Sequence, residues 1–481
     1  MVNSAFRIES VDEYIANHQS RINWVSLPIH EVLHGDLRLE ASVYATEAEK
    51  AKLTVINNKF GVISLAELIN TNHCPRFKRV FVDKSDLPIY QPSQIKELNP
   101  SPAAYISDKT STDLDALRVK KGQILMTCSG TVGKVTLVSN TMDNYIFSHD
   151  LLRINVKNER DIGYLYTYFL TELGRLIVSA NNYGAVIKHI EPSHLLSVPV
   201  PNAPLLIRKL CNEKIEESFR LRDLSNNLLE KANKILKEKL SLPSIDELQE
   251  EIKSKKQLGF TVSSKDLSNR LEAKYHHPLV KKILIHLEKN AGCIKSLSNH
   301  LVSRSILLPS RFKRYYVEPE YGVPFLGGKE ILELDPRGDK FLSLKQHGDL
   351  IKNQLILKEN TILITCSGTI GKVCLVPKHW NGWAASQHLL RVIPLSDKNA
   401  GYLYAWLSSE WALPLIRRYT YGAVVFEIDQ HHLGDVPVPI IDEENMDLIN
   451  NLVLEANCLR TKAYDLEQES LNIFNNQVLK N

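Results

Sequence analysis

The chain has 481 residues, of which 43% are hydrophobic and 24% charged, a composition typical of a folded globular protein with more than one core. Its net charge of +4 and pI near 8.5 permit an anionic partner such as nucleic acid but are too small to indicate one. Seven cysteines without a CxxC pair argue against a disulfide framework or a zinc site, and neither a signal peptide nor a membrane-spanning run is evident, so we expect a cytoplasmic protein.

The dominant feature of the sequence is internal repetition. Residues 124–135 (ILMTCSGTVGKV) recur as residues 362–373 (ILITCSGTIGKV), a shift of 362 − 124 = 238 positions. Four further repeats follow at the same shift: 148–154 with 386–392, 163–166 with 401–404, 183–186 with 421–424, and 198–201 with 436–439. Looser matches precede them, 38–41 with 270–273 and 76–79 with 311–314. A period this long predicts two tandem domains, because solenoid repeats are much shorter.

Each copy is expected to be a compact α+β domain. Residues 124–126 and 362–364 are short apolar runs of β-favouring residues between glycine-containing turns, which is typical of strands. Helical stretches follow at residues 163–179 and 401–418, where apolar residues recur at helical intervals.

A long amphipathic helix is predicted after each copy. No Gly or Pro lies between Pro204 and Leu240, and apolar residues recur there at three- and four-residue steps, a pattern that returns over residues 444–480. A helix of about 36 residues would be ~54 Å long, too long to be covered by one small domain. We therefore expect the two helices to pair as an antiparallel coiled coil. The predicted parts are a first domain (1–202), a central helix (203–242), a second domain (243–440, with a linker at 243–265) and a C-terminal helix (441–481).

Two similar domains at opposite ends of a rod suit a DNA duplex. B-DNA repeats every ~34 Å, so paired domains can meet successive major grooves on one face while the rod sets their spacing.

The order of these motifs, present twice, resembles the DNA-specificity subunit of type I restriction–modification systems. The resemblance rests on ILxTCSGTxGKV, a Leu-Tyr helix, YGAV, VPVP and a long helix, and it covers almost the whole chain. It implies that each copy is a target-recognition domain that reads one half of a split DNA sequence. The front segments 44–75 and 276–309 differ between the copies, and the differing half-site specificities are expected there.

The resemblance also implies partners. The two helices would form the spacer and the docking surface for two adenine-methyltransferase subunits, with nuclease-translocase subunits added where the system also restricts. The chain itself would have no catalysis and no cofactor. S-adenosylmethionine, and ATP with Mg²⁺ in a restriction complex, would belong to the partner subunits.

Candidate DNA-binding residues come first from the densest basic repeat. It consists of Arg76, Lys78 and Arg79 in the first copy and Arg311, Lys313 and Arg314 in the second. Contact with phosphates or reading of guanine by an arginine is one interpretation, and a solvated basic edge is the other. Phe77 and Phe312, inside the two runs, are expected to be core anchors.

The SGTxGK loops supply further candidates: Ser129, Thr131 and Lys134, with Ser367, Thr369 and Lys372 as counterparts. They do not fit a nucleotide-binding P-loop, because Cys128 stands where Gly is needed and Val135 where Ser or Thr is needed. The loops could touch DNA phosphates, or they could be structural hairpins that keep strands in register. Tyr183 and Tyr421, each followed by Gly, could present a ring to DNA or close a turn.

Nothing in the sequence favours catalysis. His149-Asp150 invites comparison with a catalytic dyad, but Gln387-His388 stands at the corresponding place. No NPPY or DPPY tetrapeptide and no glycine-rich cofactor loop is present, and His431-His432 lacks further metal ligands nearby. We therefore predict a DNA-binding subunit that is not an enzyme. The alternatives are a coiled-coil scaffold with duplicated protein-binding domains and an unrecognised nuclease or methyltransferase.

Overall fold

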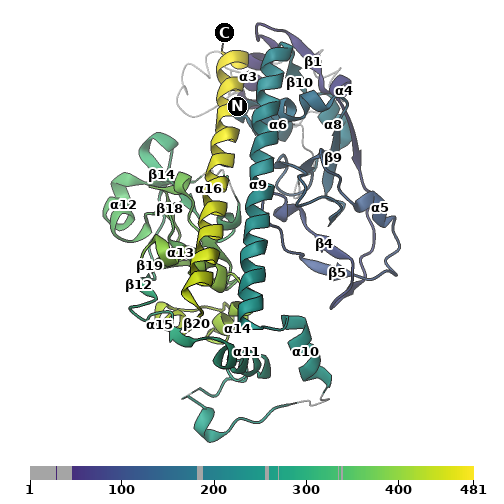
Figure 1. Ribbon diagram of the computed structural model, residues 1–481. Helices are drawn as coiled ribbons and strands as arrows, with labels where there is room; N and C mark the ends of the chain where they lie inside the picture. Colours follow the sequence, from purple (N-terminus) through teal and green to yellow (C-terminus); the bar gives the residue numbers. More distant parts are fainter. Residues whose placement is uncertain are drawn as a thin grey trace, which may run out of the picture.

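A computed structural model describes residues 29, 46–180, 188–254, 259–268, 270–333, 335–336 and 340–480. Two similar domains lie on opposite sides of a pair of long helices (Figure 1). The predicted start of the first domain, with the match at 38–41, lies outside the described residues.

The two copies have the same elements in nearly the same order. The first copy contains α3 (Thr46–Ile56), β1 (Val62–Ser64), α4 (Leu65–Leu68), β2 (Ile69–His73), β3 (Phe81–Val82), β4 (Pro88–Tyr90), β5 (Ala104–Ile106), α5 (Leu114–Leu117), β6 (Ile124–Thr127), β7 (Val135–Leu137), β8 (Ile146–Phe147), β9 (Leu151–Val156), α6 (Ile162–Leu170), α7 (Glu172–Ala180), α8 (Pro192–Leu196) and β10 (Pro199–Pro201). The second copy contains α11 (Pro278–Asn290), β11 (Cys293–Ser296), β12 (Ser303–Leu307), β13 (Tyr316–Val317), β14 (Gly322–Leu326), β15 (Phe341–Ser343), α12 (Leu344–Leu350), β16 (Ile362–Thr365), β17 (Val373–Leu375), β18 (Ala384–Ala385), β19 (Leu389–Pro394), α13 (Asp397–Leu407), α14 (Ala412–Arg417), α15 (Gln430–Gly434) and β20 (Pro437–Ile440). The long helices are α9 (Leu205–Leu240) and α16 (Glu443–Phe474), and α10 (Ile245–Ser254) leads into the second copy.

Each copy is built on the same three sheets. The central antiparallel sheet has the strand order β2-β9-β6-β7 in the first copy and β12-β19-β16-β17 in the second. A smaller sheet has the order β3-β5-β4-β8 or β13-β15-β14-β18, and its last pair is parallel in both copies. A two-stranded sheet, β1-β10 or β11-β20, joins the front of each copy to its VPVP motif. The expected α+β class and the duplication are confirmed.

The strongest repeat, ILxTCSGTxGKV, is a β-hairpin in both copies. Met126 pairs with Val135 and Ile364 with Val373, so the SGTxG segment is the turn between two buried strands. A hairpin is compatible with both interpretations left open by the sequence, contact with DNA phosphates and a structural role in holding the strands in register.

The predicted helix over residues 163–179 is wrong in one respect, because it is broken into α6 and α7. Thr171, in extended backbone (φ −62°, ψ 153°), ends α6. Its hydroxyl donates to the Tyr168 carbonyl (2.7 Å) and accepts from the Gly174 N–H (3.0 Å), replacing helical bonds. The stretch over residues 401–418 is likewise divided into α13 and α14. The apolar pattern continues across both breaks because the two helices bury residues in one core.

The long helices run antiparallel and in contact, as expected (Figure 1). The Ser218 hydroxyl of α9 donates to the Ala463 carbonyl of α16 (2.7 Å), and Arg460 Nε donates to Ser225 Oγ (3.1 Å). As the residue numbers rise along α9, the numbers of the contacted residues in α16 fall, so the two helices run in opposite directions. The helices share this packing with their own domains, since α6 crosses α9 and α13 crosses α16.

An approximate two-fold axis relates the two halves of the molecule. Leu221 and Leu459 are 459 − 221 = 238 positions apart, so they are equivalent residues, and they share one hydrophobic cluster between the helices. A residue that packs beside its own counterpart must lie close to the axis that exchanges the copies. In Figure 1 this exchange takes β4 of the first copy to β14 of the second.

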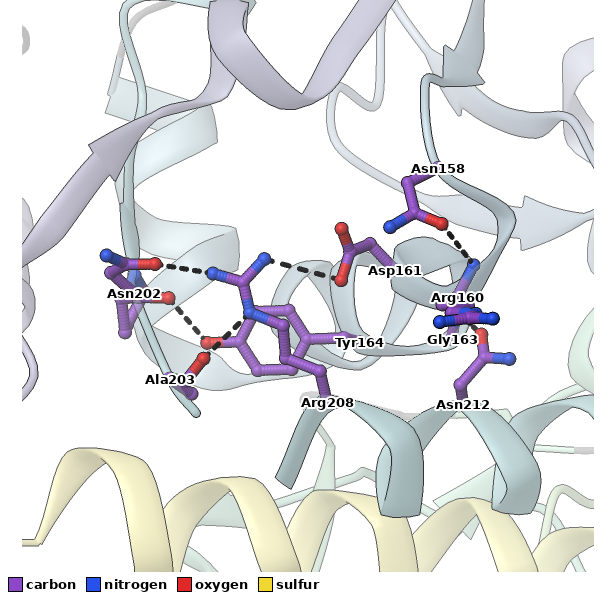
Figure 2. A network of polar contacts seen from close by, with 10 residues as sticks. Asn158, Arg160, Asp161, Gly163, Tyr164, Asn202, Ala203, Arg208 and Asn212 are labelled. Atoms are coloured by element: carbon purple, nitrogen blue, oxygen red, sulfur yellow. Dashed lines mark hydrogen bonds and ion pairs between the residues drawn. The ribbon is translucent and has the colours of Figure 1, made fainter. Parts of the chain in front are cut away.

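Gly163 and Gly401 allow each domain to cross its long helix closely. A Cβ at Gly163 would lie 2.5 Å from the Asn212 Cα, and one at Gly401 would lie 2.4 Å from the Asn450 carbonyl oxygen. The side-chain oxygen of each asparagine accepts the N–H of the glycine, at 2.7 Å in the first copy (Figure 2) and 2.8 Å in the second. The glycines that open the GYLY repeats are therefore required by packing.

The tyrosines of the same repeats hold the VPVP strands. Tyr164 Oη donates to the Pro201 carbonyl and Tyr402 Oη to the Pro439 carbonyl, each at 2.7 Å. Because proline has no N–H, these strands pair on one edge only, with β1 or β11. Two of the repeated motifs are thus explained by the joint between sheet and helix.

A buried ion pair strengthens this joint in the first copy (Figure 2). Arg208 of α9 lies 3.3 Å from the Asp161 carboxylate, donates to Asn202 Oδ1 (2.6 Å) and covers the Tyr164 ring at 5.4 Å. The second copy cannot form this pair, because Met446 stands at the corresponding position.

Further along α9, Asp223 fastens the first domain to the helix. Its carboxylate accepts four hydrogen bonds, from the hydroxyls of Ser139 (2.6 Å) and Thr141 (2.7 Å) and from the N–H groups of Asn140 and Thr141 (both 3.0 Å). In the second copy Asn457 of α16 donates to a main-chain carbonyl of the corresponding turn (3.1 Å). Each domain is thus held at more than one point along its helix.

Candidate nucleic-acid interface

The repeated motifs converge on one end of each central sheet. In the first copy Leu151 at the start of β9 pairs with Thr127 at the end of β6, and Leu152 pairs with His73 at the end of β2. The loop after β2, the SGT hairpin turn and the turn before β9 therefore meet at this end. The second copy repeats the arrangement with the ends of β12 and β16 and the start of β19. We call these two regions the loop ends of the sheets.

A buried arginine in each central sheet braces its loop end. Arg153 of β9 donates to the carbonyls of Leu117 (3.0 Å) and Phe147 (3.3 Å). Arg391 of β19 donates in the same way to the carbonyls of Ala385 (2.6 Å) and Leu389 (2.6 Å). Burial lowers the pKa of both guanidinium groups, to about 10 for Arg391. These arginines hold the turns in place and are too deeply buried to reach DNA themselves.

In the first copy the basic run 76–79 lies on this loop end. Arg79 Nη2 lies 3.3 Å from His149 Nδ1 and 3.7 Å from Asp150 Oδ2, and its guanidinium lies 5.7 Å from the Phe77 ring centroid. Burial lowers the pKa of His149; the nearby Asp150 opposes this shift, and the positive charge of Arg79 adds to it. Arg79 is therefore a fixed brace, whereas Arg76 and Lys78 are exposed.

The second copy places its basic run in the same way. Arg314 Nη2 donates to Ser386 Oγ (3.2 Å) and Gln387 Oε1 (3.1 Å) of the turn before β19. Arg311 and Lys313 are exposed, and Arg311 is bound by both carboxylate oxygens of Glu427 at 2.9 and 3.0 Å. The predicted basic residues of both copies are thus brought together with the hairpin turns. Half-buried Phe77 and Phe312 pack on small hydrophobic clusters, as expected of anchors.

The turn of each SGT hairpin lies beside these residues. The hydroxyl residues are half-buried at Ser129 and Ser367 and exposed at Thr131 and Thr369. The main chain of Ser129 pairs with His189, and that of Ser367 with Glu427, which ties each turn to the segment after YGAV. Contact of these four residues with DNA stays a prediction.

Lys134 and Lys372 face the other copy. Lys372 Nζ lies 3.7 Å from Glu97 Oε1 of the first copy. Lys134 is one of the two lysines whose charge acts on Glu333 of the second copy. Their predicted DNA contact remains untested, and the structure gives each a carboxylate of the other copy as a neighbour.

The YGAV segment of the second copy forms an exposed apolar hairpin. The main chains of Tyr421 and Glu427 exchange hydrogen bonds of 3.0 and 2.9 Å, closing a turn in which Val424 is 96% exposed and Val425 and Phe426 are also exposed. Lys274 Nζ lies 5.2 Å from the Phe426 ring centroid. The turn interpretation of Tyr421 agrees with this geometry, while Tyr183 of the first copy lies outside the described residues.

Sequence reasoning missed Glu97 and Glu333. The signal was present as a short repeat, residues 95–100 (IKELNP) and 331–336 (ILELDP), at a shift of 331 − 95 = 236. It also missed Asn212, Asn450 and Asp223 of the long helices, for which the amphipathic pattern gives no signal.

The described residues contain neither a candidate metal site nor a helix that could span a membrane. No group of three or more His, Cys, Asp or Glu side chains in that part of the chain could hold a metal ion. Over the same residues, no helix combines the length and the apolar character needed to cross a membrane.

Comparison with known proteins agrees with the geometry. The family model for the type I restriction modification DNA specificity domain matches residues 57–238 and 312–445, well over half of the chain. Similar solved structures include a type I restriction-modification S subunit from M. genitalium (13% identity, 88% of this chain, 96% of that chain, TM-score 0.33) and an HsdS subunit from Thermoanaerobacter tengcongensis (13% identity, 86% and 95%, TM-score 0.26). A third, from a study of complex assembly and conformational transition of the type I R-M system, is 13% identical over 86% of this chain and 96% of that chain (TM-score 0.26). A comparison with curated proteins found no significant match. Because the family model covers more than half of the chain in two segments, the chain belongs to the family of type I restriction–modification DNA specificity domains and carries that domain twice.

Proposed function

We propose that the chain is the specificity subunit of a type I restriction–modification complex, in which each copy reads one half of a bipartite DNA target. The observation that carries the proposal is the duplicated loop end, where basic side chains and a hairpin turn meet in the same arrangement in both copies. In the second copy the YGAV segment lies beside them. The two-fold relation of the copies suits a duplex, whose two strands run in opposite directions.

The loop ends offer two kinds of contact. Arg76, Lys78, Arg311 and Lys313 are exposed cations suited to phosphates or to the acceptor edge of guanine. The apolar hairpin beside Arg311 suits a groove, where Val424 and Phe426 would contact base edges or a step between bases. Phosphate contacts would position each domain, and the hairpin and front loops would contribute to reading the sequence.

The proposed partners follow from the family to which the chain belongs. The helical pair would set the gap between the half-sites and dock two adenine-methyltransferase subunits. This chain would bind no cofactor. S-adenosylmethionine would be held by the methyltransferase subunits, and ATP with Mg²⁺ by nuclease-translocase subunits if the system restricts.

The DNA face is tested by the salt dependence of binding. The double variant Arg76→Gln/Lys78→Gln, in the complex with its methyltransferase, should bind target DNA more weakly. The slope of log K against log salt should become shallower by roughly 0.9 for each phosphate that the variant no longer neutralises. Lys234→Gln, an exposed lysine on α9 paired with Glu238, is the matched control. Unchanged affinity and slope in the double variant would instead favour a scaffold whose domains bind protein.

A further inference from the structure

The short repeats that begin at Ile95 and Ile331 meet each other across the molecule. The main chains of Glu97 and Glu333 form an antiparallel β-bridge, and the Leu98 N–H donates to the Leu332 carbonyl at 3.0 Å. Since 333 − 97 = 236 is the shift of this repeat, each glutamate pairs with its own counterpart. The contact therefore lies on the approximate two-fold axis, as in the interface of a symmetric dimer.

Charged side chains make the contact reciprocal. The Glu97 side chain is only 12% exposed, and its carboxylate lies 3.7 Å from the ammonium of Lys372 in the second copy. Glu333 is buried, and the positive charges acting on it come from Lys96 and Lys134 of the first copy. Lys134 and Lys372 hold the same place in the two SGTxGK motifs. Each copy thus supplies a largely covered glutamate, and a hairpin lysine of the other copy lies near each of the two carboxylates, at 3.7 Å for Lys372 and Glu97.

This contact is also joined to the helical pair. Lys96 Nζ donates to the Asp335 carbonyl of the second copy (3.3 Å). The Leu98 carbonyl accepts from Asn226 Nδ2 of α9 (2.8 Å), and the Leu98 side chain packs on the cluster that contains Leu221 and Leu459. The contact between the domains and the Leu221–Leu459 contact between the helices both lie on the axis, and Leu98 touches both.

We propose that this clasp, residues 95–98, 331–333 and Asp335 with Lys134 and Lys372, positions the two recognition domains relative to each other and so limits the gap between half-sites that the protein accepts. Each domain is fastened to one side of the helical pair, through contacts such as Gly163 with Asn212 and Ser139 with Asp223, so a small rotation of a domain about its helix would displace its loop end. A polar and main-chain contact on the axis opposes that rotation. The proposal rests on the function proposed above, and it makes the hairpin lysines positioning residues.

The test uses variants of the full chain co-expressed with its methyltransferase, with methylated adenines mapped by long-read sequencing. Glu97→Gln and Lys372→Met should leave the bases of both half-sites unchanged but raise methylation at gaps one base pair longer or shorter by about tenfold, the ratio that corresponds to about 1.4 kcal/mol of positioning energy. The charge exchange Glu97→Lys/Lys372→Glu should bring the gap distribution back toward the wild-type width, compared with either single exchange.

A matched control separates the clasp from a general loss of charge. Glu251→Gln breaks an ion pair with Lys282 between α10 and α11, away from the axis, and should leave the gap unchanged. If Glu97→Gln and Lys372→Met read both half-sites at the wild-type gap only, the clasp does not limit spacing and the proposal is overturned.

A second readout does not depend on DNA. With exposed Cys293 and Cys458 replaced by Ser, spin labels at Lys109→Cys and Lys345→Cys report the distance between the domains. Glu97→Gln/Lys372→Met should broaden that distance distribution, and an unchanged width would contradict the clasp. Broadening in a protein without a split recognition motif would retain the clasp and reject the proposed function, so the two failures are distinguishable.

Discussion

At the scale of single residues, the repeated glycines give the sharpest test of the joint between domain and helix. Alanine at Gly163 or Gly401 would place a Cβ against the backbone of the long helix, at 2.5 Å or 2.4 Å. We expect each substitution to lower the free energy of unfolding by roughly 1–3 kcal/mol, the usual cost of overpacking.

Chemical denaturation of the purified chain measures this effect. Gly348→Ala is the control, because this glycine lies in α12 with no atom within 4 Å of an added Cβ. Alanine there should be neutral or stabilising by up to about 1 kcal/mol. Equal stability of all three variants would show that the close crossing is not required.

The clasp carries a pH dependence through Glu333. Burial raises the pKa of this carboxyl above its ordinary 4.5 in the folded chain. The folded state therefore takes up the proton first as the pH falls, so this group contributes stability that is complete below 4.5 and is lost as the pH rises through the folded pKa. Glu333→Gln removes the contribution.

Urea denaturation from neutral pH down to about 4.5 tests that sign. The difference in unfolding free energy between wild type and Glu333→Gln should move in favour of the wild type as the pH falls, with a slope of up to about 1.4 kcal/mol per pH unit. Glu251→Gln, at an exposed ion pair, supplies the comparison. Parallel curves for wild type and Glu333→Gln would contradict a raised pKa.

The sequence predicted which basic side chains lie at the loop ends, but it did not predict all of the residues that they contact. Arg79 and Arg314 were recognisable as a basic repeat, yet their bonds to the turns before β9 and β19 depend on the sheet register. The hairpin lysines Lys134 and Lys372 were predicted to contact DNA. Their carboxylate neighbours in the other copy could not be predicted, because a sequence does not show which surfaces of the two copies meet. The Glu97 repeat was too short to stand out without that contact.

At the scale of elements, periodicity predicted the two long helices and the strand pairs of the hairpins. It failed at Thr171, where the apolar pattern continues although the backbone turns, because both α6 and α7 face one core. The small sheets were also beyond prediction, since strands of two or three residues such as β3 and β18 have no usable period. Local patterns give long elements, whereas short ones depend on tertiary pairing.

The apolar hairpin of the second copy supports a prediction about reading. Val424→Ser should leave stability unchanged, because this side chain is 96% exposed, and should lower methylation at one half-site of the target only. Leu271→Ser, at an 85% exposed position in the same half of the chain, should change neither property. If the complex with Val424→Ser methylates the target as fully as the wild type in the same sequencing, the hairpin does not contact DNA.

At the scale of the whole molecule, the helices and the clasp are two restraints on one spacing. Inserting seven residues, two helical turns or ~10.5 Å, into the exposed part of 221–240 should lengthen the accepted gap by about three base pairs while both half-sites stay readable. The insertion also pulls the clasp apart, so we expect the longer gap to be methylated more efficiently when Glu97→Gln is added.

The methylome of the insertion variant, with and without Glu97→Gln, measures both effects. An unchanged gap in a stable and active complex would show that the helices do not act as a ruler. A longer gap that Glu97→Gln does not improve would show that only the helices restrain the spacing.

The central claim, that each copy reads one half of a split target, is tested most directly by mapping methylated adenines in cells that express the chain with its methyltransferase. The wild type should give a single split motif. The variant Arg311→Gln/Lys313→Gln should weaken or relax one half of that motif and leave the other half and the gap intact. A well-formed complex without any split motif, or a variant that alters both halves together, would contradict the account.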